Sequence, residues 1–148
     1  LLAGLPVVER WPHAFFIERY PVGRDATVSY GSQDFRFRND SDAVLLLNVV
    51  AAADSVEVRL SGPDLRRRVE LETGPMGDLV PPKSSAAHPR VLLDPTLPPG
   101  ERDSAEPGVD GRTVVVTRTV YAEDGRLLFQ DDFVSVYEPK DWIVRVGP

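Results

Sequence analysis

Two long alternating runs joined by a tight turn constrain the fold of this chain more than any other feature. Residues 112–122 and residues 126–138 each alternate apolar and polar side chains, which is the period of two expected for a strand with one buried face. Between the runs lie Glu123, Asp124 and Gly125, and an Asp-Gly pair suits the positive φ angles of a hairpin turn. The sequence therefore predicts a long β-hairpin near the C-terminus.

The rest of the chain also has β character, so the predicted fold class is mainly β. Residues 44–53 and 55–60 indicate a second hairpin, in which Val56, Val58 and Leu60 alternate with charged residues and predict one dry face. Further short strands are predicted at residues 15–20, 26–30, 34–39, 65–72 and 143–146.

Prolines divide this β-rich sequence into two parts. Seven of the 14 prolines fall within residues 73–99, which favours an extended, semi-rigid spacer. We therefore expect a first domain over residues 1–72, a Pro-rich linker over residues 73–89 and a small β domain over residues 90–148.

Composition and charge exclude several classes of protein. The 148 residues are 42% hydrophobic and 27% charged, which is typical of a globular chain of one or two small domains. A formal net charge of −6 argues against nucleic acid as a partner, because phosphate binding requires a basic surface. No apolar run approaches the roughly 20 residues of a transmembrane helix. Because Leu1 follows no initiator methionine or signal pattern, we expect an interior or C-terminal part of a longer product.

The residues at positions 23–38 resemble the signature of the VanW-like family. They follow a segment made of Glu9, Arg10, Trp11, Pro12 and His13. The resemblance covers residues 1–72 and implies a truncated VanW-like β segment. The family is associated with bacterial cell envelopes and, in one branch, with gene clusters for glycopeptide (vancomycin) resistance. The resemblance thus implies a setting and leaves the molecular activity open.

A series of glycines in the last third carries a second resemblance. Their order and the predicted hairpin between them resemble the G-five (G5) domain, a small extracellular β module, over residues 90–148: Gly100, Gly108, Gly111, Gly125 and Gly147. The glycines themselves need no more than turn geometry. The resemblance implies a module that binds N-acetylglucosamine or serves as an adhesive or spacer on a cell surface.

The VanW-like resemblance also implies candidate catalytic residues. In the family a Cys-Gln pair precedes the part that resembles this chain, and a histidine and an aspartate would complete a Cys-His-Asp arrangement, for which His13 and Asp25 are the candidates. Relatives carry a histidine where this chain has Trp11 and a serine where it has Ala14. The alternatives are that His13 caps a loop and that Asp25 accepts backbone N–H groups of a turn or pairs with Arg24 or Arg10.

Candidate binding residues fall in both parts of the chain. Arg24, Tyr30 and Asp34 lie near Asp25, and Tyr30 and Asp34 are predicted to line a polar cleft with it or to form a turn closed by local hydrogen bonds. In the second part, the candidates are expected on exposed strand faces: Arg118, Tyr121, Tyr137 and Trp142. The three aromatic rings would stack on pyranose rings, and the arginine would donate hydrogen bonds to sugar hydroxyls. The alternative is that Tyr137 and Trp142 close a small core.

These observations lead to three functional hypotheses. The first is an extracellular or cell-envelope module that engages peptidoglycan or related glycans and is non-catalytic by itself. On this hypothesis an N-terminal segment outside this chain anchors it to the membrane. The second is the C-terminal part of a cysteine-dependent peptidoglycan amide or acyl-transfer enzyme, whose thiol lies upstream because this chain has no cysteine. The third is a structural spacer. No cofactor and no metal site are predicted, and the upstream segment of the same protein is a candidate partner.

Overall fold

The computed structural model describes residues 1–77 and 79–148, and within these ranges the chain is mainly β, as predicted, and contains no helix. Asp78, in the predicted linker, lies outside the described residues. The strands in these ranges are β1 (Val7–Glu9), β2 (Arg36–Phe37), β3 (Leu46–Ala51), β4 (Val56–Ser61), β5 (Arg68–Thr73), β6 (Arg90–Leu93), β7 (Arg112–Tyr121), β8 (Leu127–Tyr137) and β9 (Ile143–Val146). They form four small sheets.

The predicted C-terminal hairpin is confirmed as β7 and β8, which pair antiparallel from Arg112 opposite Tyr137 to Tyr121 opposite Leu127. The turn is closed by a hydrogen bond from the Ala122 N–H to the Arg126 carbonyl (2.9 Å), and Gly125 has a φ of +83°. A third strand, β5, pairs with the other edge of β7. The result is a three-stranded sheet in the order β5-β7-β8.

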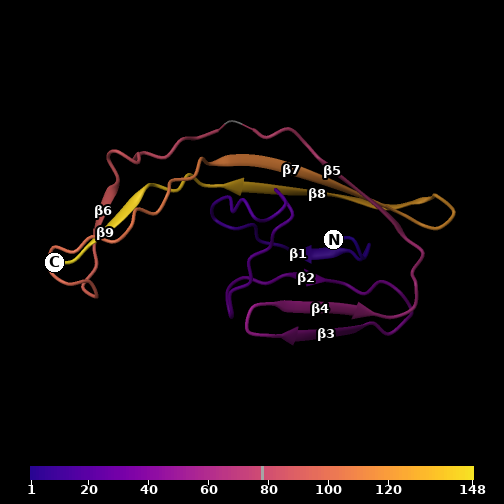
Figure 1. Cartoon of the computed structure of the whole chain (residues 1–148). Helices are drawn as coiled ribbons and strands as arrows, with labels where there is room; N and C mark the ends of the chain where they lie inside the picture. Colours follow the sequence, from indigo (N-terminus) through magenta and orange to yellow (C-terminus); the bar gives the residue numbers. More distant parts are fainter. Residues whose placement is uncertain (78) are drawn as a thin grey trace.

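One face of this sheet forms the core of the protein. Alternation in β7 and β8 directs to this face the buried apolar side chains Val114, Val116, Val120, Phe133 and Tyr137. The N-terminal residues cover this face, with β1 and β2 lying below the sheet in Figure 1. The core therefore joins residues from the first and last parts of the sequence.

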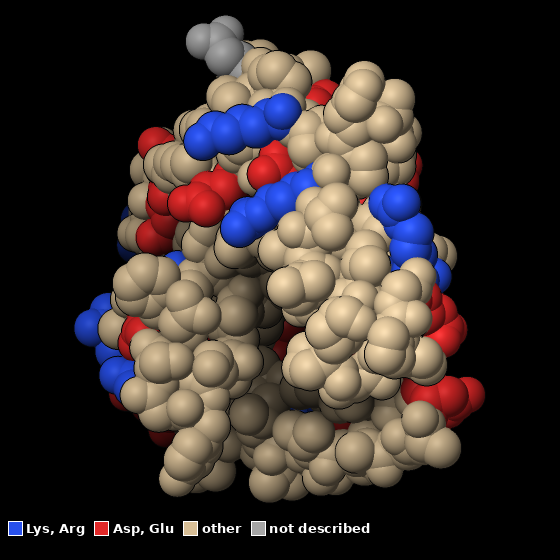
Figure 2. Space-filling model, turned by 90° about the vertical axis from the view of Figure 1, so that its left-hand side faces the viewer, with Lys and Arg blue, Asp and Glu red and all other residues tan. Residues whose placement is uncertain are grey.

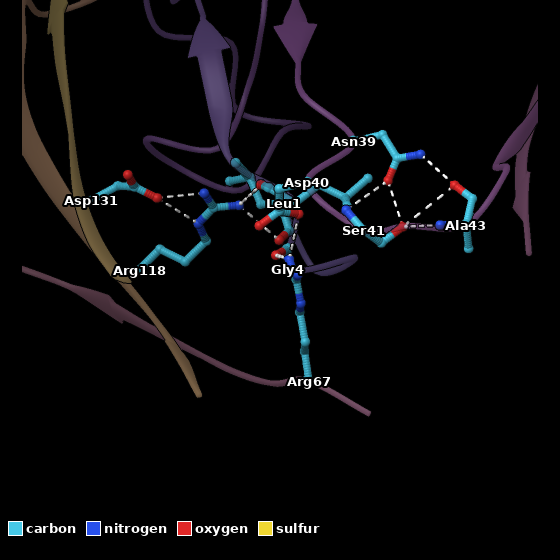
Figure 3. A network of polar contacts seen from close by, with 10 residues as sticks. Leu1, Gly4, Asn39, Asp40, Ser41, Ala43, Arg67, Arg118 and Asp131 are labelled. Atoms are coloured by element: carbon cyan, nitrogen blue, oxygen red, sulfur yellow. Dashed lines mark hydrogen bonds and ion pairs between the residues drawn. The ribbon is translucent and has the colours of Figure 1, made fainter. Parts of the chain in front are cut away.

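Arg118 is the largest fully buried side chain in the described residues and lies among these apolar groups. Its Nε donates to Asp131 Oδ2 (3.1 Å), and its Nη1 donates to the carbonyls of Leu1 (3.2 Å) and Leu5 (3.0 Å). Figure 3 shows the guanidinium lying between the Asp131 carboxylate and the N-terminal residues. A buried charge is costly unless it is paired, so this side chain fixes the N-terminal segment on the sheet through polar contacts.

The β3–β4 hairpin forms at the predicted place, but its apolar face is exposed to solvent. Leu47, Val49, Val56, Val58 and Leu60 are between 38% and 68% exposed, and the register places them on one side of the hairpin. Figure 1 shows this hairpin as the outermost layer, beyond β1 and β2. The expectation of a buried face was wrong because no described residue packs closely enough on that side to exclude water.

An apolar pocket separates this hairpin from the rest of the protein. Leu47, Val58 and Leu60 line one side of it, and residues of the N-terminal segment with Phe35 and Phe37 line the other. The hairpin is thus joined to the fold loosely compared with β7 and β8.

The strands predicted at residues 15–20 and 26–30 do not form, and residues 34–39 contain only the two-residue β2. A local turn with a hydrogen bond from Tyr20 N to Ile17 O (3.0 Å) replaces the first of them, and residues 26–30 form only an isolated bridge between Ser29 and Gln33.

The C-terminal end contains a feature that the sequence did not indicate. β6 pairs in parallel with β9, in a register that runs from Arg90 opposite Ile143 to Leu93 opposite Val146. Figure 2 looks at the end of the molecule that carries these strands, and acidic and basic side chains stand side by side there above a hollow. Glu106 is paired with both Lys140 and Arg145 at this end.

Strand β5 precedes the predicted linker, yet it pairs with β7, which follows that linker. The division into residues 1–72, 73–89 and 90–148 stays a prediction, but the hydrogen bonds of the largest sheet cross it.

Candidate functional site

The best-defined polar site is centred on Asp25, whose side chain is 4% exposed. Its Oδ2 accepts a hydrogen bond from the His13 backbone N–H (2.8 Å) and lies 2.7 Å from Nδ1 of the His13 ring. Its Oδ1 accepts from the Tyr137 hydroxyl on β8. The structure thus brings together the two predicted catalytic residues and adds Tyr137, which the sequence had suggested only as a sugar-binding or core residue.

The loop carrying Asp25 is held in place by backbone geometry. A hydrogen bond from Thr27 N to Trp11 O (2.7 Å) brings the two segments alongside each other, so that Asp25 meets His13. Gly23 adopts a φ of +70°, which favours glycine, and a Cβ added there would lie 2.6 Å from Cγ2 of Val116. Glycine at this position therefore allows both the turn and its close approach to β7.

Arg10 provides a second connection from this loop to the sheet. Its Nε donates to the Asp25 carbonyl (2.7 Å) and its Nη2 donates to Ser135 Oγ (3.0 Å), with a longer contact of 3.5 Å to Asp25 Oδ1. The Arg10 side chain is 5% exposed and its guanidinium lies 5.8 Å from the centre of the Phe133 ring. Of the two arginines considered as partners for Asp25, Arg10 is the one that binds it.

These contacts set the charge states of the cluster. Burial acts to raise the pKa of the Asp25 carboxyl, but the hydrogen bonds from the His13 N–H, the Tyr137 hydroxyl and the His13 ring outweigh it and lower the pKa below its ordinary value. Burial, followed by the hydrogen bond to Asp25, raises the pKa of Tyr137. At neutral pH the site therefore contains a carboxylate that accepts from a neutral phenol.

The His13 ring is the part of this site that solvent reaches. Its side chain is 27% exposed and stacks on Tyr20, with ring centroids 5.4 Å apart and planes 16° apart. Among the described residues Nε2 has no hydrogen-bond partner, whereas Nδ1 faces the carboxylate. A histidine oriented through Nδ1 by a carboxylate can use Nε2 as a general base. The nucleophile that such a base would serve is not a thiol of this chain, which has no cysteine.

A second candidate site is a polar surface cleft on the N-terminal part. Tyr30 and Asp34 line it as the sequence suggested, together with Glu9, Gln33 and Arg36, but Asp25 and Arg24 do not. Arg36 Nε lies 3.3 Å from a carboxylate oxygen of both Glu9 and Asp34, so the walls of the cleft are held by ion pairs. The Tyr30 ring is fully exposed, with a relative accessibility of 106%.

The four candidates of the C-terminal part have different environments. Arg118 and Tyr137 were expected on an exposed strand face, and both are buried under the N-terminal segment. Tyr121 is half-buried with the Arg68 guanidinium 4.1 Å above its ring. Trp142 is half-buried and packs closely on Gly108. A binding role for these four residues stays a prediction, and in this arrangement the surfaces of Arg118 and Tyr137 are closed to a ligand.

Sequence reasoning missed Ser135 as part of the cluster around Asp25. A signal was present, because Ser135 lies at an inward position between Phe133 and Tyr137 in an alternating strand. A hydroxyl at such a position needs a polar partner, which here is Arg10. What the sequence could not supply was the identity of that partner, 125 residues away.

Comparison with known proteins agrees with the two resemblances. Residues 1–61 match the VanW like protein family and residues 88–148 match the G5 domain. Over 63 residues the chain is 38% identical to the uncharacterized protein YoaR of Bacillus subtilis (strain 168), a match that covers 43% of this chain and 21% of that protein. The chain thus spans about a fifth of the length of this relative.

A solved structure, the crystal structure of HP0197-G5, is also similar to this chain. The match covers 55% of this chain and 97% of that one at 21% identity, with a TM-score of 0.23.

The chain therefore combines a VanW-like segment with a G5 domain, the arrangement that the sequence predicted. This combination indicates a cell-wall-associated protein. Among the described residues no helix is both long and apolar enough to cross a membrane.

Proposed function

We propose that this chain is an extracellular cell-envelope module that engages peptidoglycan or a related cell-wall glycan and is non-catalytic by itself. The observation that carries the proposal is the fully exposed Tyr30 ring beside the polar cleft. On this proposal, attachment to the membrane is supplied by a part of the protein outside these residues.

The chemistry of the cleft supports a sugar as its ligand. An exposed aromatic face stacks on the apolar side of a pyranose ring, while carboxylates and amides bind its hydroxyl groups. Asp34 and Gln33 supply such groups beside Tyr30. The ion pairs of Arg36 with Glu9 and Asp34 neutralise part of the local charge, which favours a neutral glycan over a strongly charged polymer.

Binding of the 148-residue chain to purified peptidoglycan sacculi, and to soluble glycan fragments by NMR, tests this proposal. Tyr30→Ala is expected to weaken binding by roughly fivefold to tenfold through loss of the stacking face, while Tyr30→Phe retains it. Unchanged binding of Tyr30→Ala together with a loss in Trp142→Ala would move the site to the G5 domain. Failure of the unaltered chain to bind either material would overturn the function itself.

A second function is favoured by the 2.7 Å contact between His13 Nδ1 and Asp25 Oδ2. In this alternative the pair supports a thiol from outside this chain in amide or acyl transfer on peptidoglycan. Asp25 would hold the ring, and Nε2 of His13 would take the thiol proton.

This alternative is tested in a longer form of the protein that contains a cysteine. His13→Ala is expected to abolish transfer from peptidoglycan fragments without lowering the melting temperature. A lower melting temperature with unchanged activity would assign His13 a structural role. A pure spacer would show neither glycan binding nor transfer.

A further inference from the structure

The contacts of Asp25 divide between the two parts of the protein. One carboxylate oxygen is bound by His13 from its own segment, and the other accepts from the Tyr137 hydroxyl on β8, which lies in the part that matches the G5 domain. The loop that carries Asp25 contains no strand or helix of its own. Its position therefore depends on contacts made from outside the loop.

The Tyr137 hydroxyl uses its hydrogen-bonding capacity in two directions. It donates to Asp25 Oδ1 and accepts from the Gly23 backbone N–H (3.0 Å), so it binds the loop at two points. The residue is 3% exposed, and the Phe16 ring packs against its ring edge to face with centroids 5.7 Å apart. The position of the Tyr137 ring is thus set by packing in the core, and its hydroxyl holds the loop in place.

Ser135, two residues earlier on the same face of β8, contacts the same loop indirectly. Its Oγ accepts from Arg10, whose Nε donates to the Asp25 carbonyl. Two neighbouring inward positions of β8 therefore hold the backbone and the side chain of Asp25.

We propose that Tyr137 is a positioning residue that orients Asp25 and, through it, the His13 ring, so that β8, in the part that matches the G5 domain, completes a site in the part that matches the VanW-like family. This inference rests on the second function proposed above. On this view the G5 domain is not merely a spacer beside the VanW-like part, because removing its sheet would leave the His13–Asp25 pair without its support. Ser135 assists Tyr137 through Arg10.

The physical reason is the requirement of a buried carboxylate for donors. Without the phenol, Asp25 Oδ1 would be left without the Tyr137 donor in a site that water barely reaches. The carboxylate would then turn toward Arg10, whose Nη2 already lies 3.5 Å from Oδ1, and Oδ2 would move away from His13. A histidine without a fixed acceptor loses its preference for one tautomer.

Tyr137→Phe in the 148-residue chain tests the inference, because it removes only the hydroxyl and keeps the ring that packs on Phe16. The readout is the nitrogen NMR spectrum of His13 at pH 8.5, where a free histidine is neutral. The unaltered chain is expected to show the Nδ1–H tautomer, and Tyr137→Phe a mixture of both. Tyr121→Phe, in which the hydroxyl is lost from a half-buried ring distant from Asp25, serves as the matched control and is expected to leave His13 unchanged.

A second variant keeps the inference testable if Tyr137→Phe does not fold. Ser135→Ala is expected to change the His13 spectrum in the same direction by a smaller amount. An unchanged tautomer in every folded variant would overturn the positioning role.

Activity in the longer, cysteine-containing protein separates the two ideas. A fall in kcat for Tyr137→Phe of about tenfold at unchanged KM would support both the positioning role of Tyr137 and the enzymatic function. An altered tautomer in a protein without any transfer activity would retain the positioning role and reject the enzymatic function.

Discussion

The two antiparallel hairpins of this protein both have an apolar face, and those two faces lie in opposite environments. β7–β8 and β3–β4 are both antiparallel and both place apolar side chains on one face, yet Val116 in β7 is 0% exposed while Val58 in β4 is 60% exposed. Alternation determines which side of a hairpin is apolar. Whether that side is buried depends on a covering segment from elsewhere in the chain.

The covering segment of β7–β8 is held by polar contacts as much as by apolar packing. Arg118 binds the carbonyls of Leu1 and Leu5, and Tyr137 binds the loop of Gly23 and Asp25. The apolar face of β3–β4 lacks a counterpart to these anchors, since its inward side chains carry no polar group. The comparison predicts that substitutions will have large effects in the first hairpin and small effects in the second.

Arg118→Ala is expected to have the largest effect. It removes a fully buried cation and leaves Asp131 and two carbonyls without their donor, which should lower the free energy of unfolding by about 3–5 kcal/mol. Glu123→Ala breaks the exposed pair with Arg66 beyond the same sheet and should cost at most about 1 kcal/mol. Urea denaturation measures both, and similar losses would contradict the anchoring role of Arg118.

Gly23→Ala is expected to have the second largest effect on stability. Its φ of +70° strains any residue with a side chain, and its Cβ would meet Val116 on β7, so a loss of about 2–4 kcal/mol is expected. Gly31→Ala, at a φ of +80° with no atom within 4 Å, carries only the backbone term of about 1 kcal/mol. Thermal unfolding of the two variants isolates the contact with β7, and equal melting temperatures would show that the loop does not press on the sheet.

Val116→Ala and Val58→Ala compare the two hairpins directly. The first removes two buried methyl groups and leaves a cavity, which should cost about 2–3 kcal/mol. The second shortens a side chain that water already reaches, and a change within about 0.5 kcal/mol is expected. If Val58→Ala were as costly as Val116→Ala in urea denaturation, the face of β3–β4 would be covered in solution.

The smallest effect concerns pH. The pKa of Asp25 is lower in the folded protein than in the unfolded chain, so its contribution to stability is present above about pH 4, the unfolded value, and is lost as pH falls through the folded value. Stability of the unaltered chain and of Asp25→Asn should therefore converge below pH 4. A stability difference that stayed constant from pH 7 to pH 2.5 would argue against an ionised Asp25 in the folded protein.

The sequence predicted best the two strands with long alternation, β7 and β8, and it also located the short strand β9. β7, β8 and β9 lie where the pattern indicated, within a residue or so at each end. The runs at residues 15–20 and 26–30 were misread as strands, because their aromatic and β-branched residues favour strands but find no neighbouring strand to pair with, and Phe15, Val28 and Tyr30 stay exposed. β6 was missed because four residues between prolines have no clear period, and its partner β9 lies about 50 residues away.

For the candidate site, too, the sequence predicted the local part and missed the contacts between distant positions. His13 and Asp25 were identified from the resemblance and do lie together, but their connection to Tyr137 and Ser135 joins positions more than 100 residues apart. Such pairing is decided by how the N-terminal segment lies on the sheet. The polar cleft with Tyr30 and Asp34 was local in sequence and could be anticipated, except that Asp25 points into the sheet instead.

The parallel pair of β6 and β9 has a mechanical consequence. β9 is the last strand before Pro148, and Figure 1 shows the C-terminus just beyond it. A pulling force along β9 would load its backbone hydrogen bonds to β6 in shear, all at once, whereas the same force across the open end of a hairpin would separate the bonds one by one. We expect a single-molecule pulling trace to show the separation of β6 and β9 as one rupture event. This strand pair would therefore resist a force applied along β9.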